Sequence, residues 1–472
     1  MERILTRDKV REHATKDDGW LIIDNVVWDM TGFAEEHPGG AEIIINSLGR
    51  DGSKAYNAVH SPKTVLGYFG PSRIVGRLEE AVDLADSSSS RSQPTTENKP
   101  MIELCTLVSL QDIERVALEY LPPVARTQIS AGANDNRTTK ANASSFRDIY
   151  FRPRVLSSSR SVDCKTRILG REYAIPVFNA PASLAKLVHP DGELAIARGL
   201  AAKGSTIIIP TMGSFLPEEI VAALPPGHPF FFQLYVGTNR ESTKRLLESV
   251  VALKAEAIIV TVDLPVVGKR DDVRRLQMQT SPPNNNKETS KSASNLAIDP
   301  DLSWIDIHWI RQITGLPVFV KGIQSAEDAK RAFSEGCAGI YISNHGGRAV
   351  DTAQPAILTL LEINIHCPEV LERMDVFIDG GIRRGTDILK AICLGASAVC
   401  LGRPILHSLT YGQDGIEHAL NILKEELDVA MQLCGIKSLD EAHPGLLNTA
   451  ALERFVYGKE GQRARHIVRG RL

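Results

Sequence analysis

Two histidines in the first part of the chain are placed where both could bind one metal ion. His37 lies in "EEHPGG" and His60 in "NAVHSP", 23 residues further along. A lone histidine is usually a surface or core residue, so the pattern around the pair decides its meaning. The sequence predicts short helices over residues 39–49 and 61–70, and an apolar cleft between them could hold a flat ring with one imidazole reaching each face. Iron in a porphyrin takes imidazole ligands in this way.

A second set of reactive side chains recurs at the ends of short apolar runs in the rest of the chain. Eight such runs, rich in β-branched and aromatic residues, alternate with segments of helical spacing such as "DGELAIARGLAAKG". This alternation predicts an α/β fold, a parallel (β/α)8 TIM barrel whose strand carboxyl ends share one face, where active sites form. The residues at these ends are Gln233, Tyr235, Asp263, Lys321, His345, Asp379 and Arg403.

Two segments rich in glycine and arginine close the predicted barrel. The first, "DGGIRRGTD", follows the seventh apolar run, and the second, "LGRP", ends the eighth. At this place the fold often binds a phosphate with backbone N–H groups and a helix N-terminus. The two segments together favour a bound phosphate, and a flavin mononucleotide would fit the cavity above the barrel.

A change in composition divides the chain into two domains. Residues 79–100, "EEAVDLADSSSSRSQPTTENKP", are polar and rich in serine, which predicts a flexible linker. A small α+β domain of residues 1–78 precedes the linker, and the barrel domain of residues 101–472 follows it. In the small domain, "WLIIDNVVWDMT" predicts two strands joined by a turn at Asp24 and Asn25.

Charge and cysteine usage exclude several classes of protein. With 54 basic and 57 acidic side chains the net charge is −3, so neither nucleic acid nor an anionic membrane surface is expected as a partner. No apolar run approaches the roughly eighteen residues of a membrane span. The seven cysteines are an odd number without a C-x-x-C pair, which predicts reduced thiols in an intracellular protein. The charged start "MERILTRDKV" lacks the features of a signal or mitochondrial presequence, so a cytoplasmic location is expected.

The motifs resemble two known families. "HPGG" with a following histidine at this distance resembles cytochrome b5, over residues 3–78. "FRPRVL", "HPDGE", "FFQLYV", "TVDLP", "SNHGGRAVD", "IDGGIRRGTD" and "LGRP" resemble the FMN-dependent 2-hydroxy acid oxidases and dehydrogenases, over about residues 102–440. The order of haem domain, linker and flavin barrel is similar to that of the flavocytochrome b2 family. The resemblance implies haem b with axial ligands His37 and His60, FMN in the barrel, and electron transfer from a small L-2-hydroxy acid to a one-electron acceptor protein such as cytochrome c.

The resemblance also implies roles for individual residues. His345 would be the active-site base that takes a proton from the substrate as two electrons pass to the flavin. Asp263 would pair with His345 and stabilise its imidazolium. Arg270 and Arg348 match the positions that bind the substrate carboxylate, for which a guanidinium is a suitable partner. Tyr235 matches the tyrosine beside the substrate carbon and hydroxyl.

The flavin contacts implied by the resemblance come from the same strand ends. Lys321 matches the lysine near flavin N1 and O2, where its charge favours the anionic reduced flavin. The remaining flavin-contacting positions are Gln233, Thr261, Ser343, Asp379, Gly381, Arg383, Gly402 and Arg403.

Three positions depart from the family's pattern or bear on the substrate. Gln128, in "RTQISAGAND", stands where the family has a tyrosine that reaches the substrate carboxylate. Ala182 and Met212 are apolar, which suggests tolerance for a side chain larger than a methyl group. Two alternatives therefore stay open: an oxidase that uses oxygen, and a haem electron carrier whose barrel is inactive. The family also implies a homotetramer.

Overall fold

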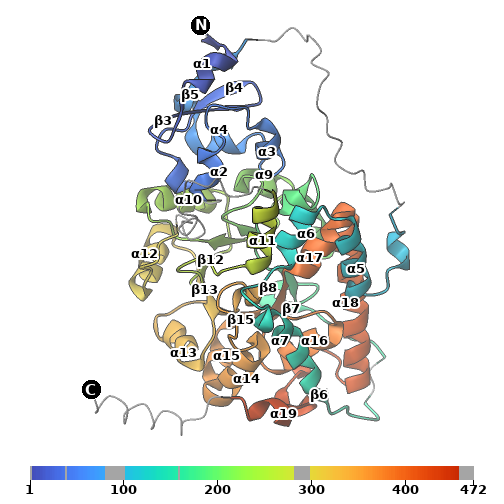
Figure 1. The fold of residues 1–472 in the computed structure, drawn as a ribbon. Coiled ribbons are helices and arrows are strands. Elements are labelled where there is room, and N and C mark those ends of the chain that lie inside the picture. Colours follow the sequence, from blue (N-terminus) through green and yellow to red (C-terminus); the bar gives the residue numbers. More distant parts are fainter. Residues whose placement is uncertain (1–2, 38–39, 80–100, 158–159, 281–297, 457–472) are drawn as a thin grey trace, which may run out of the picture.

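The computed structural model describes residues 3–37, 40–79, 101–157, 160–280 and 298–456, which form two domains (Figure 1). Residues 80–100 of the predicted linker lie outside the described residues, as do Pro38 and Gly39 of the "HPGG" motif. The small domain is drawn in blue at one end of the larger domain, close to α9 (Pro217–Ala222) and α10 (Arg240–Ala252) of that domain.

The small domain is built on a mixed five-stranded sheet with the order β1-β5-β4-β3-β2. The predicted hairpin is present, because Asp24 and Asn25 adopt left-handed φ angles of 50° and 63° between β3 and β4. Two such residues form the turn that suits the twist of a hairpin. The strands are β1 (Ile4–Leu5), β2 (Ala14–Thr15), β3 (Asp18–Ile23), β4 (Val26–Asp29) and β5 (Ile74–Leu78).

Short helices cover one face of this sheet. The predicted helices over 39–49 and 61–70 are found as the shorter α2 (Ala41–Ile45) and α4 (Thr64–Phe69), while α3 (Ser53–Asn57) was not predicted. Helix α1 (Arg7–Arg11) and the 3-10 turn η1 (Ala34–Glu36) complete the domain. An apolar core lies between the helices and the sheet; its buried members include Leu21, Trp28, Phe33, Ile44, Leu48 and Val65.

The larger domain is the predicted (β/α)8 barrel. Its eight strands pair in parallel in the order β10-β11-β12-β13-β14-β15-β16-β9. Between β10 and β9, the two ends of this order, side-chain hydrogen bonds of Asn179 replace the backbone hydrogen bonds of paired strands. Asn179 Nδ2 donates to the Ile208 carbonyl (3.0 Å), and Asn179 Oδ1 accepts from Ile208 N–H (2.7 Å). The strands are β9 (Val177–Asn179), β10 (Ile208–Pro210), β11 (Phe231–Leu234), β12 (Ala257–Thr261), β13 (Val318–Ile323), β14 (Gly339–Ile342), β15 (Asp375–Ile378) and β16 (Ala398–Leu401).

Aromatic side chains fill the inside of the barrel. Phe178, Phe231, Phe319 and Phe377 are fully buried, and the Phe319 and Phe377 rings stack with centroids 5.0 Å apart. The hairpin β7 (Thr166–Ile168) and β8 (Arg171–Tyr173) contributes Ile168 and Tyr173 to the same cluster. Because the interior is packed, a ligand must bind at the mouth of the barrel, where the strands end.

Helices surround the barrel strands. Additional helices precede the first strand in the sequence, follow the last strand, or lie in loops between strands. The barrel helices are α8 (Gly192–Ala202), α9 (Pro217–Ala222), α10 (Arg240–Ala252), α12 (Trp304–Thr314), α13 (Ala326–Ser334), α14 (Ala356–His366), α16 (Gly385–Cys393), α17 (Arg403–Ser408) and α18 (Gly412–Cys434). The additional helices are α5 (Leu110–Tyr120), α6 (Pro123–Ser130), α7 (Arg137–Ser145), α11 (Asp271–Thr280), α15 (Pro368–Arg373) and α19 (Ala450–Glu453). Within the described ranges, no helix has both the length and the apolar character needed to cross a membrane. All seven cysteines are free thiols, as predicted.

Candidate active site and haem site

Polar side chains at the ends of neighbouring strands form a buried hydrogen-bonded layer at the mouth of the barrel. Gln233 Nε2 donates to Thr261 Oγ1 (3.0 Å), which joins the ends of β11 and β12. Lys321 Nζ donates to Ser343 Oγ (3.2 Å), and Ser343 Oγ donates to Asp379 Oδ1 (2.8 Å). Lys321 Nζ also lies 4.0 Å from Asp379 Oδ2, so its buried charge has a carboxylate as counter-ion. The layer presents a fixed set of donors to a planar polar ring system.

His345 and Asp263 form a buried pair beside this layer. His345 Nδ1 lies 2.9 Å from Asp263 Oδ1, and the Asp263 side chain is fully buried. Burial by itself would raise the pKa of Asp263, but the charge of His345 when it is protonated, and the charge of Lys321, outweigh burial and hold this pKa below its ordinary value. The ionised carboxylate requires Nδ1 of the neutral imidazole to be the donor, which leaves Nε2 free to accept a proton.

Local backbone geometry places this pair. His345 adopts a left-handed φ of 59°, and its N–H donates to Ser343 Oγ (3.0 Å). Tyr235 OH lies 3.4 Å from His345 Nε2, so the phenol and the accepting nitrogen face the same space. Gly322, with φ of 112°, gives room to the carboxylate, since a Cβ there would lie 2.6 Å from Asp263 Cβ.

Two guanidinium groups, of Arg270 and Arg348, line the same cavity as His345. Arg348 is half-buried and donates to the Ile129 carbonyl, and Arg270 Nη1 donates to the Gln128 carbonyl (3.5 Å). Burial, and then the neighbouring charge of Arg270, lowers the pKa of Arg348 to about 10. Burial also lowers the pKa of Arg270. Two cations forced together in this way favour a bound anion between them.

A third cationic group lies at the ends of β15 and β16. Arg403 donates through Nη1 to the Gly346 carbonyl (3.0 Å) and through Nε to the Ile129 carbonyl (3.2 Å). Its pKa is lowered well below the ordinary value by burial and then by the charges of Arg348 and Arg383. Gly381 has a φ of 89°, and a Cβ there would lie 2.1 Å from the Asn142 carbonyl oxygen, so the close backbone approach requires glycine.

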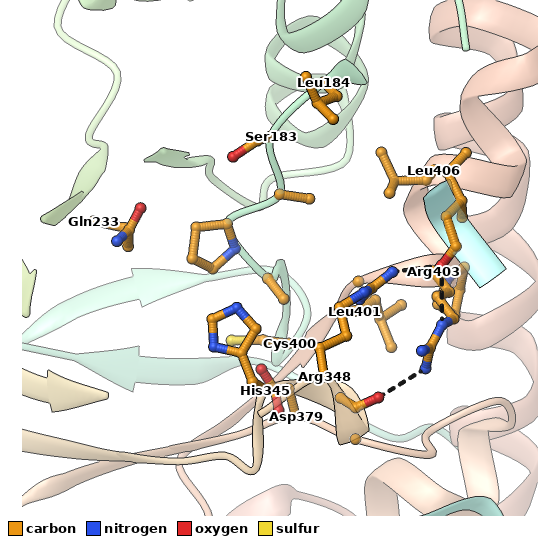
Figure 2. A pocket seen from close by; sticks show the side chains of 18 of the residues that line it. Ser183, Leu184, Gln233, His345, Arg348, Asp379, Cys400, Leu401, Arg403 and Leu406 are labelled. Atoms are coloured by element: carbon orange, nitrogen blue, oxygen red, sulfur yellow. Dashed lines mark hydrogen bonds between the residues drawn. The ribbon is translucent and has the colours of Figure 1, made fainter. Parts of the chain in front are cut away.

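These groups surround one cavity of about 240 Å³ (Figure 2). The predicted site residues that line it are Gln233, Tyr235, Arg270, Lys321, His345, Arg348, Asp379, Gly381, Arg383, Gly402 and Arg403. Asp263, Thr261 and Ser343 lie one layer behind and contact lining residues instead. The buried polar layer at one part of the cavity suits a flavin ring, and the half-buried Arg383 and Arg403 at another part suit its phosphate, so the residues present fit FMN.

The substrate side of the cavity carries the positions that depart from the family. Gln128, Ala182 and Met212 all line the cavity, together with the apolar Leu264 and Val267. Gln128 and Met212 also line a larger cavity that extends from the barrel mouth to His37 and His60. Gln128 therefore lies where the two cavities adjoin, as do Met212 and Tyr235.

His37 and His60 face one another in the small domain. Their ring centroids are 6.2 Å apart with an interplanar angle of 75°. Imidazoles that bind one metal ion from opposite sides, each through a bond of about 2 Å, have centroids about 6 Å apart. His37 Nδ1 lies 3.3 Å from the Gly40 carbonyl, a contact of the kind that orients a metal ligand. His60 Nδ1 is buried without a hydrogen-bond partner among the described residues.

The surroundings of the two rings suit haem. Burial lowers the pKa of both histidines, that of His60 to about 4, so both are neutral as metal ligands must be. Apolar side chains of the small domain, among them Ile44, Val65 and Phe69, line the cavity that contains both rings. The described residues hold no cluster of three or more histidine, cysteine or acidic side chains that could form another metal site.

The sequence did not point to the residues that hold the catalytic loop in place. Asn142 on α7 and Asn344 exchange two side-chain hydrogen bonds, each 2.8 Å, and both are buried. Asn344 directly precedes His345, so this pair fixes the loop that carries the base. Asn344 could have been found within the "SNHGGR" motif. Asn142 carries no signal of its own, because its partner lies 202 residues away.

Two family models match the chain. A model described as FMN-dependent dehydrogenase matches residues 117–449, and one described as cytochrome b5-like haem/steroid binding domain matches residues 6–83. These matches fall on the barrel and on the small domain, respectively.

Two proteins that are similar to this chain along most of its length have names that mention both a dehydrogenase and a cytochrome. An L-lactate dehydrogenase (cytochrome) of Wickerhamomyces anomalus is 35% identical over 95% of this chain and 80% of its own. A protein of the same name from Saccharomyces cerevisiae is 34% identical over the same shares of the two chains. Among solved structures, a double mutant of flavocytochrome b2 with pyruvate bound is similar with a TM-score of 0.71 and 36% identity, over 75% of this chain and 90% of that one.

Proposed function

Because this chain belongs to the FMN-dependent dehydrogenase family, in the flavocytochrome b2 group that carries a cytochrome b5-like haem domain, we propose that it oxidises an L-2-hydroxy acid with a side chain larger than methyl and delivers the electrons to a cytochrome c-like protein. Its class, an FMN-dependent 2-hydroxy acid dehydrogenase with haem b as second cofactor, follows from the family. The finer choice of substrate and acceptor is the proposal.

The observation that carries the chemistry is the arrangement of Asp263, His345 and Tyr235. His345 Nε2 takes a proton from the substrate, and Asp263, 2.9 Å from Nδ1, stabilises the imidazolium that forms. The Tyr235 hydroxyl, 3.4 Å from Nε2, is placed to hydrogen-bond the substrate oxygen. Arg270 and Arg348 bind the carboxylate and orient the substrate carbon toward the base.

The same mouth holds the flavin. When bound, FMN accepts the two electrons of the hydroxy acid, and haem b accepts electrons one at a time for an external acceptor. Lys321, Gln233 and the strand-end layer would contact the ring system, while Arg383, Arg403 and the backbone around Gly381 and Gly402 would hold the phosphate. The packed phenylalanines beneath exclude water from below the ring.

The substrate's size is inferred from the outer wall of the cavity. Ala182, Met212, Leu264 and Val267 form an apolar wall, and Gln128 replaces a phenol by an amide that can donate only a weaker hydrogen bond to a carboxylate. A longer apolar side chain on the substrate would contact this wall and add binding energy of about 0.8 kcal/mol for each buried CH₂ group.

Anaerobic flavin bleaching across a panel of L-2-hydroxy acids tests this proposal. We expect the rate constant divided by the half-saturation concentration to rise from lactate to hydroxy acids with four to six carbons, by about threefold to fourfold per carbon. The matched variant Gln128→Tyr should raise the value for lactate by about tenfold, because it returns a phenol to the carboxylate. A maximum at glycolate or lactate in the unaltered protein would contradict the inferred substrate size.

Neither alternative function has an observation in its favour. An oxidase would leave the haem site, with its two neutral facing imidazoles, without a role, and an inactive barrel is at odds with the complete pairing around His345. Reduction of cytochrome c by substrate, compared with consumption of oxygen, distinguishes the dehydrogenase from the oxidase. The homotetramer and the cytoplasmic location stay predictions.

A further inference from the structure

The small domain contacts the barrel through the segment that carries the candidate iron ligand His60. Lys186 Nζ, from the loop that follows β9, donates to the carbonyls of Asn57 (2.9 Å) and His60 (2.7 Å). These are the last residue of α3 and the ligand itself. A single barrel side chain thus bonds both ends of the turn that presents His60.

A second pair of hydrogen bonds lies directly beyond His60. Ser61 N–H donates to the Ser214 carbonyl (2.7 Å), and Ser61 Oγ donates to Glu219 Oε1 (2.9 Å) at the start of α9. Ser61 is buried by this contact, with 1% of its surface exposed. Close packing continues at Gly67, where a Cβ would lie 2.7 Å from Leu216 Cδ1. The contact is therefore specific in geometry and includes no ion pair among the described residues of its two sides.

The barrel side of this contact is rigidly supported. Lys186 N–H donates to Ser214 Oγ (3.2 Å), so the two contacting loops are bonded to one another. Ser214 N–H in turn donates to Glu193 Oε1 (2.9 Å), and Glu193 is buried. We call Lys186, Ser214 and Glu219 the docking triad.

The loop that carries Lys186 also reaches the flavin cavity. Its residues Ala182, Ser183 and Leu184 line that cavity, and Leu187 lines both the flavin cavity and the cavity around the two histidines. A short path therefore runs from the wall of the flavin cavity, along this loop to Lys186, and through one hydrogen bond to the backbone of His60. Short, bonded connections of this kind fix the separation of two redox centres.

We propose that Lys186 is a positioning residue for electron transfer within this protein: it holds the His60 segment over the barrel mouth, and its ammonium group favours the reduced state of the haem. The inference rests on the proposed function. The two electrons of one hydroxy acid would reach the haem one at a time, with the external one-electron acceptor removing the first before the second arrives, so the docked geometry would be used twice in a turnover. A cation bonded to a ligand's carbonyl stabilises the iron state of lower positive charge.

The test compares Lys186→Met with Lys186→Arg, which keeps the charge, and with Lys330→Met, an exposed lysine on α13, as a matched control. In rapid-mixing experiments on the full-length holoprotein, flavin reduction by the hydroxy acid should be unchanged in all three. Haem reduction should slow by about tenfold to a hundredfold in Lys186→Met, because each of the two hydrogen bonds lost is worth about threefold to tenfold, and by less than threefold in the other two.

Two further readouts do not need turnover. The haem reduction potential, measured by spectroelectrochemistry, should be lower in Lys186→Met than in the unaltered protein. Amide hydrogen exchange of a peptide spanning residues 57–61 should be faster, because Ser61 N–H loses its protected position. These two measurements judge the docking role even if the hydroxy acid proposal fails. Unchanged exchange and potential in Lys186→Met, or equal slowing of flavin and haem reduction, would overturn the inference.

Discussion

His345 can act as a base because of its two hydrogen-bonding neighbours, Asp263 and Tyr235. Its Nδ1 is bonded to a fully buried carboxylate, and its Nε2 faces the cavity beside a phenol. The low pKa of Asp263 keeps this carboxylate ionised, so the imidazolium formed during the reaction is stabilised without the proton moving to Asp263.

Replacing the base should separate chemistry from cofactor binding. We expect His345→Gln to slow flavin reduction by any 2-hydroxy acid at least 10²- to 10⁴-fold, the usual contribution of a general base. Bound FMN should be retained, because in the proposed arrangement Arg383 and Arg403, not His345, hold the phosphate. The measurement is anaerobic flavin bleaching, with the flavin absorbance of the gel-filtered protein as control. Reduction at nearly the original rate would refute the role of His345.

The two histidines of the small domain give a second residue-level prediction. Since both rings lie at the separation of two ligands to one ion, His37→Ala and His60→Ala should each abolish the low-spin bis-imidazole haem spectrum. The flavin should stay bound in both variants, because the barrel has its own core. A haem spectrum that survives both changes would rule out this ligand pair.

The sequence identified the reactive residues better than their supports. His345, Asp263 and Lys321 follow apolar runs, and the ends of parallel strands must meet, so their neighbourhood was predictable. Asn142 and Lys186 were not predicted, because each acts on a partner more than a hundred residues away in the chain. Such contacts arise only from tertiary packing, on which local periodicity carries no information.

At the scale of elements, the strands could be predicted from the sequence, but the contact between β9 and β10 that closes the barrel could not. The apolar runs correspond to β9 through β16 because buried parallel strands are almost wholly hydrophobic. The replacement of the ladder between β9 and β10 by the Asn179 side chain has no counterpart in the hydrophobic pattern. Helix α3 was also missed, since its five residues, "SKAYN", are too few to show helical periodicity.

Helix α8 gives a prediction about pH and stability. Burial raises the pKa of Glu193, in its first turn, to about 7 from an ordinary value of 4.5. A raised pKa means that folding favours the protonated carboxyl, so its stabilising contribution is complete below pH 4.5 and is lost as the pH rises through about 7. Relative to Glu193→Gln, the free energy of unfolding of the unaltered protein should fall by roughly 3 kcal/mol between these limits.

Urea unfolding at a series of pH values measures this difference, because contributions of other groups are shared by the two proteins and cancel. The amide introduced by Glu193→Gln does not titrate, and its oxygen can still accept the hydrogen bond from Ser214 N–H. Parallel stability curves across this pH range would contradict the assignment of a protonated buried Glu193.

At the scale of the whole molecule, two separately packed domains meet through few polar contacts. The apolar cores of the small domain and the barrel are distinct clusters, and four hydrogen bonds involving Lys186, Ser214 and Glu219 connect the domains beside His60. Interfaces of this kind are broken and remade more easily than a shared core. The haem domain can therefore dock for internal transfer and leave the barrel to meet an external acceptor.

The predicted linker gives the last prediction, because its length would set how often that docking occurs. If the 22 residues of segment 79–100 behave as the flexible coil that their composition predicts, their r.m.s. end-to-end distance would be roughly 25 Å, and the haem domain would have an effective concentration of about a millimolar near the barrel. Deleting about half of these residues should prevent the domain from reaching its docked position without strain. Flavin reduction by substrate should be untouched, whereas haem reduction should slow selectively. A glycine- and serine-rich replacement of equal length should keep both rates. If both steps slow equally in the shortened protein, or if neither does, the linker does not set the frequency of docking.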